Sequence, residues 1–383
     1  MTFKFTFKKV ILFLFLPAFI FIFWQSYSAI TFRPFTSSIN LNSNQIKGAY
    51  HLHTIYSDGI RPPDEIAKRA SRAGLDFIII TDHGGANFKS LANQGWRKGV
   101  LVIAGSEVTV REGHFVALGF ELPKTEFLPI AKLAMRQVKE LGGFSIVAHP
   151  YNLKIPWFKW PSKGFIGIEI INGDSLFRKD FLTSFPYLFT FLINPQYALL
   201  KMTDYPEDNL KKWDELNLKR RVFGIFALDA HLFYNALFKF LNLYLLIEKP
   251  LPSNFEKAKE EVLNTLREGK FYNAIEGVAR ADGFKFWAKR GNQKIQMGEM
   301  KRLRFPVNLK IVAPFSFSTE TRLIRNGKLI LESTRKEINF RVKRPGVYRV
   351  EVFLRESSPL SSRIPWIISN PIFLRKLKEE KGE

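Results

Sequence analysis

Short apolar runs alternate with amphipathic stretches through the middle of the chain. The runs are rich in β-branched residues and end at turn-forming residues, which is typical of buried strands. They cover residues 76–81, 100–104, 115–120, 144–148, 166–171 and 222–228. Between them, apolar residues recur at helical spacing over 62–74, 127–141, 208–219 and 255–268. Strands that alternate with helices predict parallel βα units, and therefore an α/β fold that is a TIM-like barrel or an open doubly wound sheet.

Beyond Gly283 the helical spacing stops and only strand-like runs remain. These runs are separated by Gly and Pro turns and cover residues 284–288, 308–313, 321–326, 328–332, 337–342 and 347–354. A series of short strands with no helix between them predicts a small all-β sandwich. We therefore expect an α/β domain over residues 46–280 and a β-sandwich domain over residues 281–383.

The amino-terminal residues have the layout of an export signal. Lys4, Lys8 and Lys9 precede an apolar run over residues 10–24, and a polar linker follows over residues 31–45. At about 1.5 Å per residue this run is shorter than the roughly 30 Å hydrocarbon core of a bilayer, unless flanking residues join it. Residues 1–30 are therefore either a cleaved signal peptide or a retained transmembrane anchor. In both cases we expect the remainder to lie outside the cytoplasm, secreted, periplasmic or tethered to the membrane.

The amino-acid composition limits which kinds of active site and partner the protein can have. The chain has no cysteine, which excludes disulfides, thiolate metal sites and a cysteine nucleophile. Its 58 Lys and Arg against 35 Asp and Glu leave a net charge of +23, which favours anionic partners. Residues 281–383 hold 23 of the basic and 10 of the acidic residues, a net of +13. More than half of the excess charge therefore belongs to the predicted sandwich rather than to the α/β domain.

Potential metal ligands follow the predicted strands. His51 and His53 end the first strand, and an i, i+2 pair in extended backbone points both rings to one side. The carboxyl ends of barrel strands meet at one face, so side chains placed there converge. The expected cluster comprises His51, His53, Asp58, His83, Glu107, His114, His149, Asp229 and His231. Imidazole and carboxylate ligands suit zinc, manganese and iron alike, and no GxxxxGK, HExxH or GxSxG motif offers a competing chemistry.

In order along the chain, these motifs resemble those of the PHP (polymerase and histidinol phosphatase) superfamily. The segments that carry the resemblance are residues 50–59, 80–83, 106–107, 113–114, 148–150 and 228–231. The resemblance implies a distorted seven-stranded TIM-like barrel, a (β/α)7 PHP barrel, with two or three divalent metal ions. By this resemblance the first ion is held by His51, His53, Glu107 and Asp229, the second by Glu107, His114 and His149, and the third by Asp58, His83 and His231. We expect Glu107, Asp229 and His231 to take part in catalysis as well.

The carboxyl-terminal residues 345–353 and 365–372 are similar to the sandwich of the carbaryl-hydrolase-like branch of PHP proteins, whose members cleave carbamates. Three functions therefore stay open. The first is hydrolysis of a phosphoester, and the second is hydrolysis of a carbamate, ester or amide. The third is a non-catalytic module that binds an anionic polymer. Expected partners are a small anionic substrate and, through the amino terminus, a membrane; a nucleic acid is disfavoured because no row of basic and aromatic residues is visible.

Other residues near the motifs have supporting roles in this scheme. Asp82 precedes a ligand and is expected to orient it or to cap a helix, and Glu169 and Asn172 are candidates to line the pocket. The cations that follow metal-site loops or barrel segments are candidates to hold a phosphate; they are Arg61, Lys154, Arg178 and Arg280. The apolar stretch 181–200 either packs over the site or touches a bilayer.

Overall fold

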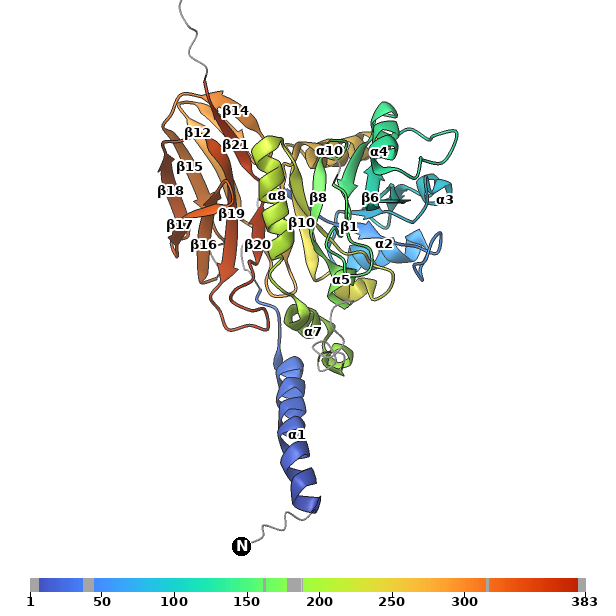
Figure 1. The fold of residues 1–383 in the computed structure, drawn as a ribbon, viewed down its shortest axis with the longest axis vertical. Helices are drawn as coiled ribbons and strands as arrows, with labels where there is room; N and C mark the ends of the chain where they lie inside the picture. The colour runs from blue at the N-terminus through green and yellow to red at the C-terminus, as the bar shows by residue number, and fades with distance from the viewer. Residues whose placement is uncertain are drawn as a thin grey trace, which may run out of the picture.

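A computed structural model describes residues 7–36, 45–160, 163–177, 187, 189–314 and 317–377. The chain has a mixed α/β fold in which the helices lie among the strands of the first two thirds and strands alone follow (Figure 1). The α/β class is therefore confirmed. Residues 1–6 of the predicted signal or anchor and residues 37–44 of the predicted linker lie outside the described residues.

The first part of the α/β region is built on parallel strands. Strand β1 (Gln45–Leu52) pairs in parallel with β2 (Phe77–Ile80), which pairs in parallel with β4 (Val100–Ala104). Helix α2 (Pro63–Arg72) connects β1 to β2 and buries Ile66, Ala67 and Ala70. On its other side β1 pairs with the antiparallel strand β10 (Leu241–Leu246), which pairs with β11 (Phe271–Ile275).

A second, five-stranded sheet supplies the remaining strands of this region. Its strands are β5 (Ser106–Val110), β6 (Gly113–Leu118), β7 (Phe144–Val147), β8 (Gly167–Asn172) and β9 (Phe223–Ala227). Isolated bridges at Leu52–Ala230 and His83–Glu107 connect it to the first sheet. The hydrogen-bonded ladders therefore form two sheets that touch at the ligand residues, and the single closed seven-stranded TIM-like barrel stays a prediction.

The helices of this region begin and end at local sequence signals. Helix α10 (Phe255–Glu268) begins where the Asn254 side chain accepts a hydrogen bond from Lys257 N at 3.0 Å. It ends at Gly269, whose φ of 72° is left-handed and suits glycine. Helices α4 (Ala131–Glu140) and α8 (Glu207–Lys219) cover β6, β7 and β8. Of three short helices, α3 (Phe88–Ala92) and α9 (Tyr234–Leu237) follow the ligands His83 and His231, and α5 (Gly173–Phe177) follows β8.

After β11, the described residues form strands and loops but no helix. One four-stranded sheet contains β12 (Lys285–Arg290), β13 (Gln293–Gln296), β15 (Val307–Val312) and β18 (Glu337–Val342). The other strands are β14 (Met300–Leu303), β16 (Thr319–Arg325), β17 (Lys328–Ser333), β19 (Gly346–Leu354), β20 (Ile367–Ser369) and β21 (Ile372–Lys376). Because β20 pairs with β11, these strands continue the sheet of β1. The domain boundary at residue 281 stays a prediction, and the sheet runs across it.

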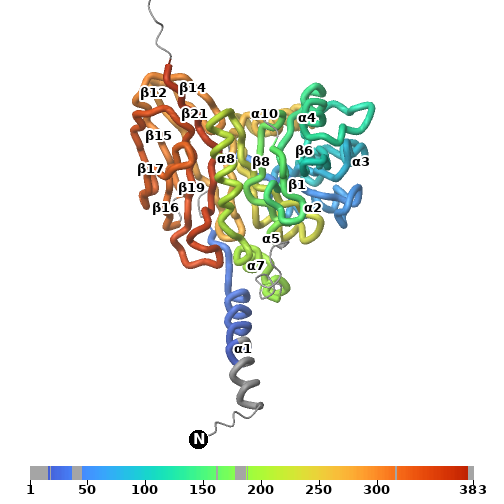
Figure 2. The backbone as a smooth tube through the Cα atoms, in the orientation of Figure 1, coloured from blue at the N-terminus to red at the C-terminus, as the bar shows by residue number. Residues whose placement is uncertain are grey.

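Helix α1 (Phe7–Thr31) projects from the body at the end where α5 and α7 (Pro195–Met202) lie (Figures 1 and 2). Its carboxyl end is held by α7 and the residue before it. Asn194 Nδ2 donates to Ala29 O at 2.9 Å, and Tyr197 Oη donates to Gln25 Oε1 at 2.6 Å. Among the helices that the structure describes, none combines the length and the hydropathy that crossing a membrane requires.

Candidate metal centre

Glu107, on β5, is the centre of the predicted ligand cluster. Its side chain is buried, and five imidazoles surround its two oxygens. Oε2 lies 3.2 Å from His51 Nε2, 3.3 Å from His53 Nε2 and 3.3 Å from His83 Nδ1. Oε1 lies 2.9 Å from both His114 Nδ1 and His149 Nε2. A carboxylate with ligand nitrogens at both oxygens is placed to be shared between two metal ions.

Asp229, which follows β9, completes the deepest group of ligands. Its Oδ1 lies 3.2 Å from His53 Nε2 and 3.6 Å from His51 Nε2. Together with Glu107 these residues offer four ligand atoms that all lie within 4.8 Å of one another. The Nε2 atoms of His51 and His53 are buried without a hydrogen bond. Since these nitrogens lie beside carboxylate oxygens without a hydrogen bond, and neutral imidazole is a strong metal ligand, this donor set fits a divalent cation.

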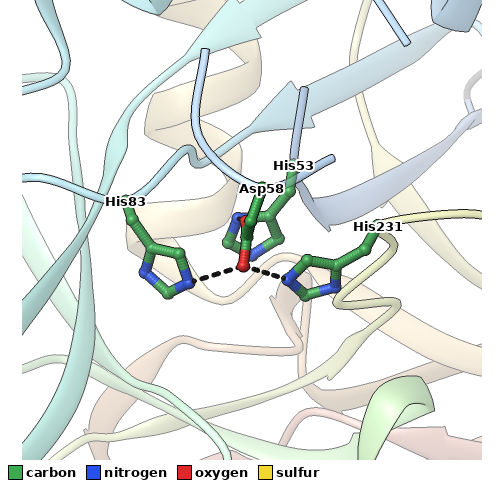
Figure 3. Close-up of side chains that lie close together, drawn as sticks. All are labelled: His53, Asp58, His83 and His231. Atoms are coloured by element: carbon green, nitrogen blue, oxygen red, sulfur yellow. Dashed lines mark ion pairs between the residues drawn. The ribbon is translucent and has the colours of Figure 1, made fainter. Parts of the chain in front are cut away.

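Asp58 forms the open side of the cluster. Its Oδ2 lies 3.1 Å from His231 Nε2 and 3.5 Å from His83 Nε2, and its Oδ1 lies 3.2 Å from His53 Nδ1 (Figure 3). The side chains of Asp58 and His83 are 52% and 34% exposed, whereas that of Glu107 is 1% exposed. The cluster is therefore open to solvent on the Asp58 side.

The backbone at three ligands is left-handed. The φ angles are 68° at His51, 25° at His149 and 50° at Asp229. Such values cost roughly 1–3 kcal/mol each for residues other than glycine, and they occur where surrounding structure imposes them. The regular extended backbone assumed for His51 and His53 is therefore wrong at His51, where the pairing of β1 with β2 also shifts register. Both rings nevertheless reach Glu107.

Glu169 and Asn172, on β8, support the deepest ligands. With Glu169 as the acceptor, His51 Nδ1 carries the proton and donates to Oε1 at 2.6 Å, which leaves His51 Nε2 to a metal. The backbone N–H of His149 and Asn172 Nδ2 donate to Glu169 Oε2 at 2.8 and 2.9 Å. Asn172 Nδ2 also lies 3.1 Å from Asp229 Oδ2. The expectation that these two residues reach the pocket agrees with their positions.

Asp82 holds the loop that carries Asp58. Its carboxylate accepts hydrogen bonds from Thr54 N at 2.6 Å, Thr54 Oγ1 at 2.7 Å and Ser57 Oγ at 2.6 Å, and from Ser90 Oγ. The expected orienting role therefore has a structural basis, although the group that Asp82 orients is the loop before Asp58 rather than its own neighbour His83.

Two aromatic residues hold ligand backbones and were not anticipated from the sequence. Tyr234 Oη lies 2.8 Å from the carbonyl oxygens of both His53 and His231. Trp157 Nε1 donates to His114 O at 2.8 Å. Tyr234 follows His231 by three residues, a spacing that signals proximity, but nothing in the sequence pairs residue 157 with residue 114.

Opposite charges control the titration of the cluster. Burial lowers the pKa of His51, but the carboxylates of Glu169, Asp229 and Glu107 outweigh it and raise that pKa above its ordinary value of 6.5. Burial also lowers the pKa of His53, but its acceptors Asp229 and Asp58 outweigh burial and raise that pKa above its ordinary value. Burial raises the pKa of Glu107, but the surrounding imidazoles have the larger effect and lower it below its ordinary value. Without metal, the carboxylates and protonated imidazoles therefore stabilise one another.

Two of the four predicted phosphate-binding cations pair with acidic residues outside the cluster. Arg61 lies 3.3 Å from Glu65, and Arg280 Nε lies 2.7 Å from Asp282. Neither pair includes a ligand of the cluster. Lys154 is exposed in the loop after His149, and Arg178 lies outside the described residues.

The α/β fold gathers nine His, Asp and Glu side chains at and beside its strand ends, in groups that could hold metal ions. The chain belongs to the PHP domain family, whose model matches residues 49–275, more than half of the sequence. The chain is 32% identical over 124 residues to the uncharacterized protein MJ1587 of Methanocaldococcus jannaschii. The match covers 28% of this chain and 69% of that protein. The predicted superfamily is therefore confirmed, and its carbaryl-hydrolase-like branch stays a prediction.

The solved structures that match this chain are distant from it in sequence and have low TM-scores. A two-domain protein from Bacteroides vulgatus that contains a predicted PHP-like metal-dependent phosphoesterase is 16% identical with a TM-score of 0.44, over 89% of this chain and 99% of that one. A putative metal-dependent phosphoesterase from Bifidobacterium adolescentis is 13% identical with a TM-score of 0.32, over 48% of this chain and 87% of that one. TM-scores this low carry no assignment of activity.

Proposed function

We propose that this protein is a metal-dependent hydrolase that cleaves a phosphoester at the cluster around Glu107. The observation that carries the proposal is the position of this buried carboxylate, whose two oxygens lie between five imidazoles. A single structural metal needs only about four ligands, and such sites are closed to solvent. This cluster contains nine candidate ligands and is open at Asp58.

The residues divide into groups that fit two or three divalent ions of zinc, manganese or iron. His51, His53, Glu107 and Asp229 would hold the deepest ion, and Glu107 would share a second with His114 and His149. Asp58, His83 and His231, with His53 beside them, would hold a third at the mouth. Bound ions of this kind lower the pKa of a water molecule and polarise the ester.

The side chains around the ligands keep this arrangement in order. Glu169 fixes the proton of His51 on Nδ1, and the carbonyl oxygen of Asp229, 3.0 Å from His231 Nδ1, does the same for His231. His231 Nε2 is therefore left facing Asp58 at the open side, where a substrate arrives. Burial of Glu107 and Asp229 excludes bulk water from the floor of the site, which strengthens electrostatic interactions there.

The substrate and location are part of the proposal. Residues 1–280 keep a net charge of +10, which favours an anionic substrate and so suits a phosphoester better than a neutral carbamate, ester or amide. The carbamate alternative rests on the resemblance of the carboxyl-terminal segment, of Trp213-Asp214 and of residues 266–274 to the carbaryl-hydrolase-like branch. The amino-terminal sequence supports export with the catalytic region outside the cytoplasm, anchored by residues 1–30 or released by their cleavage.

Metal analysis and a substrate panel test the proposal on the full-length protein. Metal content is measured in wild type, His51→Ala and Asp229→Ala, and each is assayed on a phosphomonoester, a phosphodiester and a carbamate. Asp64→Ala is the matched control because its carboxylate is 67% exposed and lies on α2 outside the cluster. We expect both ligand variants to lose metal and at least about 100-fold in kcat/KM, roughly 2.7 kcal/mol, and the control to lose neither. Wild-type protein without bound metal, or unchanged activity in both ligand variants, would refute the proposal, and cleavage of the carbamate alone would favour the alternative.

A further inference from the structure

Loops that carry metal ligands also expose large apolar side chains. Leu153 and Phe158, in the loop that follows His149, are 75% and 71% exposed. The other ligand-bearing loops show the same feature at Ile55 and Ile60 beside Asp58, at Phe88 after His83, and at Leu232 and Phe233 after His231. Single exposed apolar residues are common on protein surfaces, but a set gathered around one opening marks an interaction surface.

A chain of contacts connects this rim to helix α1. The rings of Phe233 and Phe191 pack edge to face with centroids 4.8 Å apart. The neighbouring Leu192 is 84% exposed, and Asn194, two residues further, bonds to the carboxyl end of α1. Helix α1 and the metal site therefore lie at the same end of the molecule, the end at which α5 follows β8 (Figures 1 and 2).

The exposed part of α1 is apolar on every side. Residues 19–24 are all large and apolar, and each is at least 44% exposed. At about 3.6 residues per turn, six consecutive residues cover the whole circumference of a helix. A groove on a partner protein takes one face of an amphipathic helix, whereas a helix that is apolar all round suits a lipid environment.

The charge of the rim is also suited to a lipid surface. Residues 150–160, which include Leu153 and Phe158, contain Lys154 and Lys159 and no acidic residue. Apolar side chains beside lysines are the composition of segments that bind anionic membranes, where the apolar groups enter the interface and the cations meet the headgroups. The loop is held in place by Trp157, whose indole N–H donates to His114 O.

We propose that the metal-site end of the protein docks on an anionic lipid surface, with residues 153–158, Leu192 and Phe233 at the interface together with α1. The open side of the cluster at Asp58 then faces the lipid headgroups. The second half of the inference rests on the proposed function: the substrate is an amphipathic phosphoester taken from that surface.

The natural absence of cysteine allows the docking geometry to be measured on the full-length protein. Leu153→Cys and Leu192→Cys variants carry an environment-sensitive fluorophore, and Leu329→Cys is the matched control because Leu329 is a 53% exposed leucine on β17. Each is mixed with vesicles of phosphatidylcholine, with and without phosphatidylglycerol. We expect blue-shifted, brighter emission at 153 and 192 with phosphatidylglycerol, and no change at 329. Vesicle-bound protein whose labels at 153 and 192 stay silent, or protein that does not bind the vesicles, would overturn the docking.

A second measurement separates docking from catalysis. The rate on phosphatidic acid in these vesicles is divided by the rate on p-nitrophenyl phosphate in solution, for wild type and Leu153→Glu. Because burying a leucine contributes roughly 1.5–3 kcal/mol, loss of Leu153 from the interface should lower this ratio by about tenfold or more. An unchanged ratio would overturn the assignment of an interfacial substrate. Labels that respond as expected in a protein that hydrolyses neither compound would refute the proposed function and leave the docking supported.

Discussion

Glu169 offers a test of how the metal site is supported from behind. Its carboxylate is buried and accepts hydrogen bonds from His51 Nδ1, the backbone N–H of His149 and Asn172 Nδ2, at 2.6, 2.8 and 2.9 Å. Two of these three donors belong to predicted ligands. Replacing the carboxylate therefore perturbs the metal site without removing a ligand.

The two informative replacements differ in what they leave behind. Glu169→Ala leaves His51 Nδ1 and the backbone N–H of His149 without an acceptor, while Asn172 Nδ2 keeps Asp229 Oδ2. It also frees the His51 ring to move its proton to Nε2, the atom needed by the metal. Glu169→Gln keeps one acceptor oxygen for His51 but turns an N–H₂ group toward two other donors. Alanine should therefore weaken the control of the His51 proton position more than glutamine, which keeps one acceptor for Nδ1.

The size of the effect follows from the type of bond that is lost. A hydrogen bond to a charged group contributes about 1.5–3 kcal/mol. Loss of an outer carboxylate behind a metal-bound histidine costs about 10–100-fold in metal affinity or activity, which is roughly 1.4–2.7 kcal/mol. The two ranges agree. We expect Glu169→Ala to lose metal affinity by about 10–100-fold, with Glu169→Gln between it and wild type.

Metal affinity is measured by competition with a chromophoric chelator, and kcat/KM is measured on the best substrate found. Glu276→Gln is the matched control, because Glu276 is also buried and bonded, to Lys47 at 2.8 Å, but its bonds reach no ligand of the cluster. Thermal unfolding in EDTA identifies variants that fail to fold. The reasoning is refuted if folded Glu169→Ala binds metal as tightly as wild type, or if the control loses as much affinity.

Two further predictions concern stability. Arg349 on β19 bonds to Asp214 of α8 at 2.8 and 2.9 Å and to Glu351. Arg349→Met leaves both acids uncompensated and should lower the free energy of unfolding, measured in urea, by about 3–5 kcal/mol. A decrease under about 1 kcal/mol would contradict this. The raised pKa values of His51 and His53 stabilise the metal-free protein fully below pH 6.5 and lose this effect as pH rises through them. Protons then compete less with the metal, so the increase in melting temperature on adding Mn²⁺ should grow as the pH rises, and an increase that shrinks would contradict the assignment.

Much of the fold and the ligand set follow from the local sequence. The strands at residues 100–104 and 337–342 and the helix at residues 255–268 have the bounds expected from their apolar spacing. All nine predicted ligands converge, since each stands beside a strand end or in a loop that follows one. Strands β5 and β10 were not predicted from the sequence. β5 is a short run that pairs with the adjacent β6, and β10 pairs with β1, which lies about 200 residues earlier in the chain.

Only the tertiary structure decided how the ligands are held and what surrounds them. The sequence identifies the six histidines and three carboxylates as a metal-binding series, because ligand chemistry depends on residue type and on its place relative to a strand. The sequence does not show that the two oxygens of Glu107 lie between five imidazoles. It also does not show that Glu169 fixes the His51 proton, or that α1 leaves the body beside the open site. Those relations depend on contacts between residues tens to more than one hundred positions apart, which no local pattern encodes.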